Sequence, residues 1–308
     1  MEKTNCRISE AALLIQSGKL VAFPTETVYG LGANALDAAA VARIFAAKGR
    51  PSTSPLIVHV DSVEMARGLA REWPQAAETL ARTYWPGPLT LVVPKRANVP
   101  DIVTAGLDTV GLRMPRHPLA LELIRAAGVP IAAPSANRFA ELSPTTAEHV
   151  RKSLGEAVDC VLDGGSTPVG IESTVLSLAG PAMLLRPGMI PREDIEALIG
   201  PVETVGVVEG AHPSPGMHPR HYSPRTPVIM GAPPAAGRGA HLYMTHPSGA
   251  ARVIGMPRDA REYAAVLYST LHALDAEGWD WIAVEMPPDT PEWAGIRDRL
   301  TRAGEPRT

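Results

Sequence analysis

The chain has 308 residues, 45% of them hydrophobic and 20% charged, and a formal charge of −3 that is spread along its length. This composition predicts a soluble globular protein with a large buried core, and it excludes a generic polyanion binder, because a nucleic-acid role would need a local basic face. No stretch approaches the roughly 20 apolar residues of a membrane span, and the N-terminus lacks the basic-then-apolar order of a signal peptide, so we expect a cytoplasmic protein with no membrane contact.

Short apolar runs, most of them bounded by Pro, Gly or Ser, predict the strands of one sheet. The runs fall at residues 20–23, 56–60, 89–93, 110–113, 130–133, 158–162, 174–178 and 183–185. Helical patterns separate several of the runs, at residues 38–47, 62–71, 74–83, 119–127 and 145–154. Asp37 is expected to cap the first helix and Gly49 to follow its end, while Thr145 and Glu148 are spaced as a capping box. The mixture predicts an α/β domain, residues 1–200, with helices packed on a twisted mixed sheet.

Residues 201–227 follow a helical pattern at 191–199, are rich in Pro, Gly and His, and predict an interdomain linker. The linker carries Arg220, His221 and Tyr222, whose side chains recognise ligands, so we expect it also to act as an active-site strap. Residues 228–308 predict a small second α/β domain. Its expected elements are strands at 227–230, 240–244 and 281–285 and helices at 261–277 and 291–303, with a Gly/Pro loop before the first helix.

Polar, backbone-permissive motifs follow several of the predicted strands. Residues 23–32, FPTETVYGLG, offer little to a core, which is typical of a segment that holds a small polar ligand. KGRP at 48–51 is followed by three hydroxyl residues and then by a strand that carries His59. Two cations and three hydroxyls at one sheet edge suit phosphate oxygens, although Lys48 and Arg50 would equally compensate the dipole of the helix that they follow.

Two further motifs carry similar alternatives. Ser135 and Asn137, with Ser143 beyond them, would supply neutral donors to a nucleotide, or they form an ordinary turn. Arg113 ends a predicted strand, where an arginine serves either as a carboxylate clamp or in a surface ion pair.

Several familiar kinds of site are disfavoured. Residues 30–35 match the dinucleotide fingerprint in form, but the acidic residue expected about 20 positions on is missing, and no Walker-type lysine motif occurs. His212 and His218, with a third histidine nearby, lack a cysteine partner, so we predict no metal held by the protein itself. Cys6 and Cys160 are too few for a disulfide framework, and we expect two reduced thiols and no redox cofactor.

Together these residues resemble the threonylcarbamoyl-AMP synthase family in its two-domain form, with a YrdC-like catalytic domain, a linker and a smaller Rossmann-like C-terminal α/β domain. The resemblance covers nearly the whole chain. It rests on PTETVYGLG at 24–32, KGRP at 48–51, PLIVHV at 55–60, WPGPLTLV at 85–92, GLRMP at 111–115, APSAN at 133–137, ESTV at 172–175, LLRPG at 184–188, SPGMHPRHYSP at 214–224 and, in the C-terminal part, PRDAREYA and DRL.

The resemblance implies an enzyme, a nucleotidyltransferase that uses ATP with Mg²⁺ to condense L-threonine with bicarbonate or CO2, giving threonylcarbamoyl-AMP and pyrophosphate. A downstream threonylcarbamoyl transferase would then modify an adenosine beside the anticodon of tRNA, and direct tRNA contact is a further expectation. By motif position, the residues implied to contact L-threonine are Thr27, His59, Arg113, Ala133 and Ser173. Those implied to contact ATP are Lys48, Arg50, Ser54, Thr109, Ser135, Asn137, Ser143, Arg186 and Tyr222, and we expect Lys48 and Arg50 to be catalytic.

Two other functions stay open. One is a double-stranded RNA or tRNA-binding module without adenylation activity, in which Lys48, Arg50 and Arg113 would contact backbone phosphates. The other is carbamoyl-phosphate-dependent formation of a carbamoyl-adenylate, as in the hydrogenase-maturation relatives. The linker and the second domain favour threonine adenylation, because an RNA clamp has no use for a threonine-sized pocket under a strap.

Overall fold

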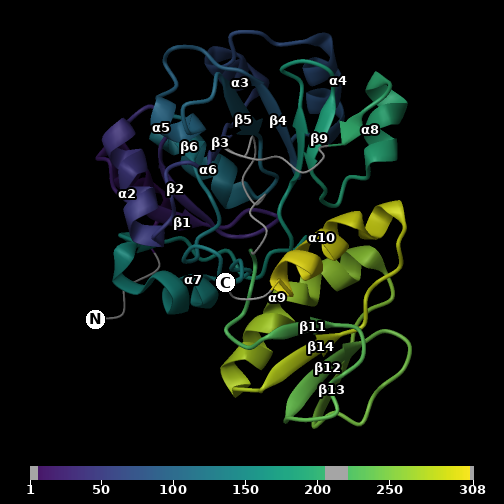
Figure 1. Ribbon diagram of the computed structural model, residues 1–308. Helices are drawn as coiled ribbons and strands as arrows, with labels where there is room; N and C mark the ends of the chain where they lie inside the picture. Colours follow the sequence, from purple (N-terminus) through teal and green to yellow (C-terminus); the bar gives the residue numbers. More distant parts are fainter. Residues whose placement is uncertain (1–5, 205–220, 306–308) are drawn as a thin grey trace.

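The computed structural model describes residues 6–204 and 221–305, and the strands of these residues form two sheets (Figure 1). The larger sheet is built, in chain order, from β1 (Val21–Phe23), β2 (Gly30–Asn34), β3 (Ile57–His59), β4 (Leu89–Pro94), β5 (Thr109–Arg113), β6 (Ile131–Ala132), β7 (Cys160–Val161), β8 (Thr174–Ser177), β9 (Met183–Arg186) and β10 (Glu203–Thr204). Across the sheet the order is β10-β9-β8-β4-β5-β3-β6-β2-β1-β7. Because β3 runs parallel to β5 but antiparallel to β6, the predicted mixed sheet is confirmed.

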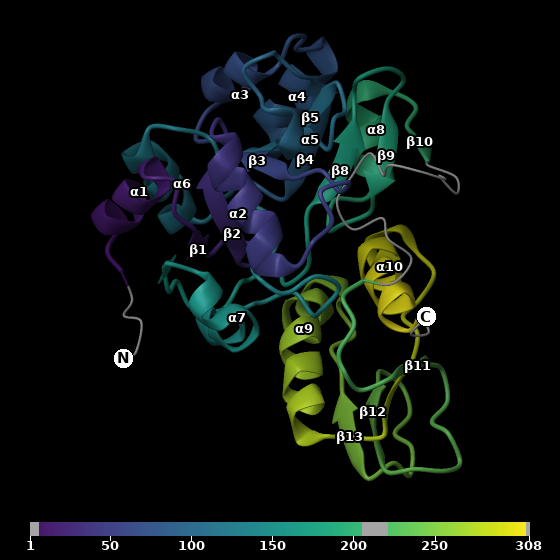
Figure 2. The same ribbon diagram turned by 60° about the vertical axis from the view of Figure 1, so that its left-hand side comes forward.

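Helices flank the larger sheet (Figures 1 and 2). They are α1 (Ile8–Gln16), α2 (Ala38–Lys48), α3 (Val63–Leu69), α4 (Gln75–Tyr84), α5 (Asp101–Thr104), α6 (Pro118–Ala127), α7 (Ala147–Leu154) with a following 3₁₀ turn (Gly155–Ala157), and α8 (Arg192–Ile199). Helix α2 shows why such segments fold as predicted. Asp37 caps it by accepting the N–H groups of Ala39 and Ala40, and Gly49 ends it with a φ of 63°, which a glycine adopts without strain.

The smaller sheet holds four parallel strands beyond residue 227. They are β11 (Val228–Met230), β12 (Gly239–Tyr243), β13 (Arg252–Gly255) and β14 (Trp281–Val284), arranged in the order β11-β14-β12-β13. Helix α9 (Ala260–Glu277), a 3₁₀ turn (Pro291–Trp293) and helix α10 (Ala294–Ala303) complete this part. Both helices lie between the small sheet and the larger part of the molecule (Figures 1 and 2). An all-parallel sheet with helices packed on it confirms the predicted Rossmann-like α/β architecture.

The two parts share one apolar cluster, so they are packed together rather than merely tethered. Val28, Leu142 and Ile171 of the larger part are buried in the same cluster as Leu267 of α9. Gly170 makes the closest approach. With a φ of +81°, it would place an added Cβ only 2.1 Å from the Ala264 carbonyl oxygen of α9, so a side chain here would separate the two parts.

Four local expectations are wrong. Residues 23–32 were expected to offer little to a core, but Tyr29 and Leu31 are core residues. Residues 30–34 form strand β2, which pairs with both β1 and β6, and Gly32 fits there since a Cβ would lie 2.7 Å from the Phe23 ring. The expected Gly/Pro loop before α9 contains β13, which pairs with β12. Helix α7 is capped by Thr146 rather than by a box at Thr145, whose N–H donates to the ring of His149.

The fourth wrong expectation concerns the cysteines. Cys6 and Cys160 form a disulfide with their Cα atoms 6.2 Å apart, so neither is a reduced thiol. Their separation of 154 residues hid this pairing from the sequence. In the fold, Cys160 belongs to edge strand β7 beside β1, and the start of α1 packs into the same apolar cluster.

Part of the predicted linker cannot be compared with the structure. His212, His218, Arg220 and most of the predicted linker lie outside the described residues. Within residues 6–204 and 221–305, none of the helices combines the length and apolarity that crossing a bilayer requires.

Candidate functional site

Strand ends of the larger sheet and the segment that begins at residue 221 line one cavity. The sheet explains why distant residues meet there. Strands β3 and β5 are parallel neighbours, and their register places His59 opposite Arg113. Strand β6 runs back beside β3, and the Ala133 N–H donates to the Ile57 carbonyl oxygen at 2.9 Å. The predicted site residues that line this cavity are Thr27, Arg50, His59, Arg113, Ala133, Ser135, Arg186 and Tyr222.

Two of the predicted threonine contacts, Thr27 and His59, are buried in the wall of this cavity. Thr27 is buried, and its hydroxyl lies 2.8 Å from that of Thr25, a second hydroxyl residue in the cavity wall. His59 is also buried, and burial, followed by the neighbouring Arg113 charge, lowers its pKa to about 3. His59 is therefore neutral at pH 7, and its Nδ1 has no hydrogen-bond partner among the described residues, so it is ready to bond to a ligand.

Arg113 takes part in a buried ion pair, which excludes the surface ion pair that the sequence left open. Its Nη2 lies 2.8 Å from Glu26 Oε1, and both side chains are only 4% exposed. Glu26 also accepts the backbone N–H of Arg116 at 2.9 Å. Arg113 is thus held inside the molecule by its partner and faces the cavity, and it is not a surface cation.

Lys48 lies behind the cavity wall rather than in it. Its Nζ donates to the carbonyl oxygen of Ser135 at 2.5 Å and to that of Asn137. Complete burial, followed by the charge of Arg50, holds the pKa of Lys48 well below its usual value. The Asn137 side chain in turn donates to the carbonyl oxygens of Arg138 and Glu141, so it stiffens the loop that presents Ser135.

Arg50 lines the cavity directly. Its Nη2 donates to the Ser54 hydroxyl and, at 3.2 Å, to the Pro55 carbonyl oxygen. Ser54 therefore helps to hold the Arg50 guanidinium in position. Burial lowers the pKa of Arg50 to about 10, so the side chain stays charged at pH 7. Its Nε has no hydrogen-bond partner within the described parts of the chain, as expected of a donor that serves a bound anion.

Two other predicted residues, Ser173 and Ser143, form a layer behind Arg186 and Glu172. Arg186 donates from Nε to the Ser173 carbonyl oxygen at 3.1 Å and from Nη2 to the Ser173 hydroxyl at 3.2 Å. Ser143 donates to Glu172 at 2.5 Å. Ser173 and Ser143 are fully buried and hold Arg186 and Glu172, which line the cavity. Thr109 alone of the predicted set lies elsewhere, in a neighbouring cavity that shares Ile57 with the first.

Tyr222 closes the cavity from the side of the C-terminal part. It is 1% exposed, lies in the shared apolar cluster and adopts a φ of 60°, which is strained for a residue with a side chain. Its ring contacts Tyr268 of α9 and lies under the Arg299 guanidinium of α10, at 5.3 Å. Its hydroxyl has no hydrogen-bond partner among residues 6–204 and 221–305. A fully buried hydroxyl in this state is suited to bind a ligand.

Sequence reasoning missed the carboxylates of the site. Glu172 lines the cavity and Glu26 pairs with Arg113 behind it, yet no carboxylate was expected. Both stand inside the quoted motifs ESTV and PTETVYGLG, so the motifs contained the signal. Arg299, which contacts Glu172, belongs to the quoted DRL, but nothing local in the sequence marks it as buried.

The residues of the cavity wall suit a metal ion that arrives bound to a ligand better than a metal ion bound directly by protein side chains. Among the described residues, no three His, Cys, Asp or Glu side chains gather as a metal site. The cavity is instead lined by arginines and hydroxyls, which bind phosphate oxygens.

A mixed YrdC-like sheet with a buried cationic cavity, closed by a Rossmann-like second part, defines the class of protein. The Sua5/YciO/YrdC family model, described as telomere recombination, matches residues 13–188, and the model for the threonylcarbamoyl-AMP synthase C-terminal domain matches residues 190–304. The chain therefore belongs to the threonylcarbamoyl-AMP synthase family in its two-domain form.

Individual relatives agree with this assignment. The chain is 43% identical to the threonylcarbamoyl-AMP synthase of Pyrococcus abyssi, over 96% of this chain and 94% of the relative, and 43% identical to that of Bacillus subtilis, over 96% and 92%. The crystal structure of P. abyssi Sua5 complexed with L-threonine superposes with a TM-score of 0.90 at 42% identity, over 96% of this chain and 94% of that one. The synthase of Halorhodospira halophila matches 51% of this chain but 83% of itself, at 38% identity. The predicted family and enzyme class are confirmed.

Proposed function

We propose that this protein makes threonylcarbamoyl-AMP from L-threonine, bicarbonate or CO2, and ATP, with release of pyrophosphate. The observation that carries the proposal is a single cavity whose wall combines arginines, the hydroxyls of Thr25 and Thr27, and Tyr222. A relative supports it, since the structure of P. abyssi Sua5 is a complex with L-threonine.

Threonine would lie near Thr27, His59 and Arg113. Arg113 would pair with its carboxylate, because a guanidinium forms two parallel hydrogen bonds with a carboxylate group. His59 would bond to threonine as a neutral ring, but its pKa of about 3 makes it a poor acceptor for the proton of the amine. Its contribution is therefore orientation rather than base catalysis.

ATP would occupy the part of the cavity between Arg50 and Arg186. Ser135, held in place by Lys48, and Tyr222 would bond to it as neutral donors. Arg50 would act as the catalytic cation, since charge builds up on the phosphates as pyrophosphate leaves, whereas Lys48, which lies behind the wall, would act by holding the Ser135 loop. Mg²⁺ would enter with the triphosphate, where it neutralises phosphate oxygens.

The reaction needs no nucleophile from the protein. The neutral amine of threonine adds to CO2 and loses a proton, which forms a carbamate. The carbamate oxygen then attacks the α-phosphorus, an O–P bond forms, and the bond to pyrophosphate breaks. Residues that orient three reactants and match developing charge are sufficient for such a step, because proximity alone lowers its barrier by several kcal/mol.

The product is a mixed anhydride that water would hydrolyse, so a closed cavity has a clear use. Tyr222 covers the cavity from the C-terminal side, which agrees with the predicted strap. The product would then pass to a downstream transferase that modifies tRNA.

Pyrophosphate release from ATP tests this proposal. We expect release to require both L-threonine and bicarbonate, and to give an adenylate that carries both. Release that is unaffected by omission of threonine would exclude the reaction. Release that depends on carbamoyl phosphate instead would identify the carbamoyl-adenylate alternative, and tRNA binding without any release would identify the RNA-binding one.

A further inference from the structure

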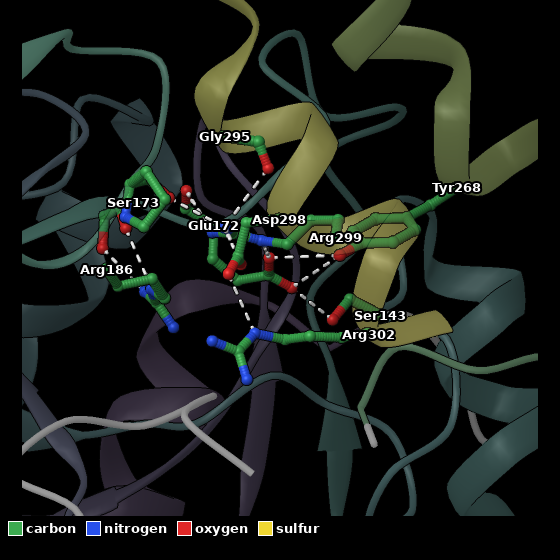
Figure 3. Close-up of polar contacts among 10 residues, drawn as sticks. Ser143, Glu172, Ser173, Arg186, Tyr268, Gly295, Asp298, Arg299 and Arg302 are labelled. Carbon is green, nitrogen blue, oxygen red and sulfur yellow. Dashed lines mark hydrogen bonds and ion pairs between the residues drawn. The ribbon is translucent and has the colours of Figure 1, made fainter. Parts of the chain in front are cut away.

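Arg299 of helix α10 reaches across the domain interface to Glu172, which lines the cavity (Figure 3). Its side chain is 0% exposed. Nε donates to the Glu172 carboxylate at 2.8 Å, Nη2 to the Glu172 carbonyl oxygen at 3.2 Å, and Nη1 to the Pro187 carbonyl oxygen at 2.7 Å. One guanidinium therefore binds the segments that precede Ser173, a predicted threonine contact, and follow Arg186, a predicted ATP contact.

Glu172 receives its remaining hydrogen bonds from both parts of the molecule. Ser143 donates to it at 2.5 Å and the Tyr268 hydroxyl of α9 at 3.2 Å (Figure 3). Burial alone would raise the pKa of Glu172, but the charges of Arg299 and then Arg186 hold it below its usual value. The carboxylate is thus anionic, and within the described chain it is the one carboxylate of the cavity wall.

An anion in this position conflicts with the binding of a triphosphate unless its charge is matched. Arg186 is the other cation that acts on Glu172, and in the structure it donates to Ser173. Without Arg299, Glu172 would attract Arg186 and repel the phosphates, because electrostatic interactions are strong at buried sites. Arg299 prevents this by neutralising Glu172 from the far side.

The position of α10 is fixed closely enough for this role. A Cβ on Gly295 would lie 2.7 Å from the Gly188 carbonyl oxygen, so the helix contacts the 187–188 segment backbone to backbone. Arg299 follows one turn later and also donates to Asp298 at 2.8 Å, which in turn accepts from Arg302 at 2.9 Å. The guanidinium is therefore held at a set distance from Glu172.

We propose that Arg299 is a positioning residue for the adenylation reaction, which neutralises Glu172 so that Arg186 is kept for the phosphates of ATP. The C-terminal domain thereby supplies part of the electrostatics of the active site. The inference rests on the proposed function, since it assigns a role in ATP binding.

The test uses the full-length protein with Arg299→Met, which removes the charge and keeps an unbranched side chain. Binding of a non-hydrolysable ATP analogue is measured by calorimetry, and the KM values for ATP and threonine by pyrophosphate release. We expect ATP affinity to fall by about tenfold or more, and the threonine KM to change by less than about threefold. Arg297→Met on the same helix is the matched control, because Arg297 pairs with Asp289 within the C-terminal domain, and it should leave both values unchanged.

The double variant Arg299→Met/Glu172→Gln separates charge from packing. Once Glu172 is neutral, no counterion is needed, so ATP affinity should return to within about threefold of the wild type. A double variant as weak as the single one, or a single variant that weakens ATP and threonine equally, would overturn the proposal. If Arg299→Met does not fold, the double variant decides alone, and its failure to fold or to bind ATP would mean that Arg299 is purely structural. Wild-type protein that binds ATP but makes no adenylate would instead refute the proposed function.

Discussion

Replacing Glu26 with glutamine tests whether Arg113 is a substrate clamp held ready by a buried ion pair. The two side chains lie 2.8 Å apart and are each 4% exposed. Removing one partner of such a pair costs about 3–5 kcal/mol, because the other charge is left buried and uncompensated. Glutamine keeps the shape and an oxygen that accepts the Arg116 N–H, so we expect the lower end of this range. At about 2–4 °C for each kcal/mol, the melting temperature should fall by roughly 6–12 °C.

The assay is thermal unfolding of both proteins with and without L-threonine. In the variant, the threonine carboxylate would supply the counterion that Arg113 has lost, so threonine should raise the melting temperature more than it does in the wild type. Glu148→Gln is the control, because its pair with Lys152 is exposed on both sides and is worth at most about 1 kcal/mol. A variant as stable as the wild type, or an equal threonine shift in both proteins, would refute the reasoning.

Three further predictions concern ATP, pH and the C-terminal part. Arg50→Ala should raise the ATP KM by about tenfold or more, because a phosphate cation is lost, and wild-type kinetics would show that it only compensates the helix dipole. Burial, followed by the charge of His272, lowers the pKa of His149 to about 4, whereas the pKa in the unfolded chain is about 6.5. The stability that the neutral ring provides is therefore complete above about pH 6.5 and declines toward pH 4. In urea unfolding from pH 7.5 to 5, His149→Asn should therefore lose less stability than the wild type, and an equal loss would contradict this. Deleting residues 212–308 should sharply reduce adenylate accumulation, and unchanged accumulation would show that the strap and domain are not needed.

Local signals in the sequence were sufficient to predict the ends of a helix where its own capping residues determine them. Asp37 caps α2 and Gly49 ends it because capping depends on side-chain and backbone groups within one turn. The mixed sheet followed from short apolar runs between helical patterns, and eight of the predicted site residues line one cavity because the ends of the strands converge.

Features that depend on distant partners were not predictable in the same way. Residues 30–34 contain two glycines and resemble a loop, but they become β2 because β1 and β6 supply hydrogen-bonding partners on both sides. The Cys6–Cys160 disulfide depends on where α1 packs, and Thr146 replaces Thr145 as a cap because His149 engages the latter. Each outcome is set by tertiary contacts that override a weak local preference.

The charges of the cavity connect the two parts of the chain. Among the described residues, three arginines line it, and two carboxylates at its wall are each matched by an arginine, Glu26 by Arg113 within the larger part and Glu172 by Arg299 across the interface. Pairing every carboxylate in this way leaves the cavity with an excess of positive charge, which is unfavourable in a buried site until an anion enters. Binding of a triphosphate would relieve that excess, so ATP affinity and the stability of the closed form are coupled. The same coupling requires α10 to be docked, because an undocked domain would return Glu172 to the cavity as an unmatched negative charge.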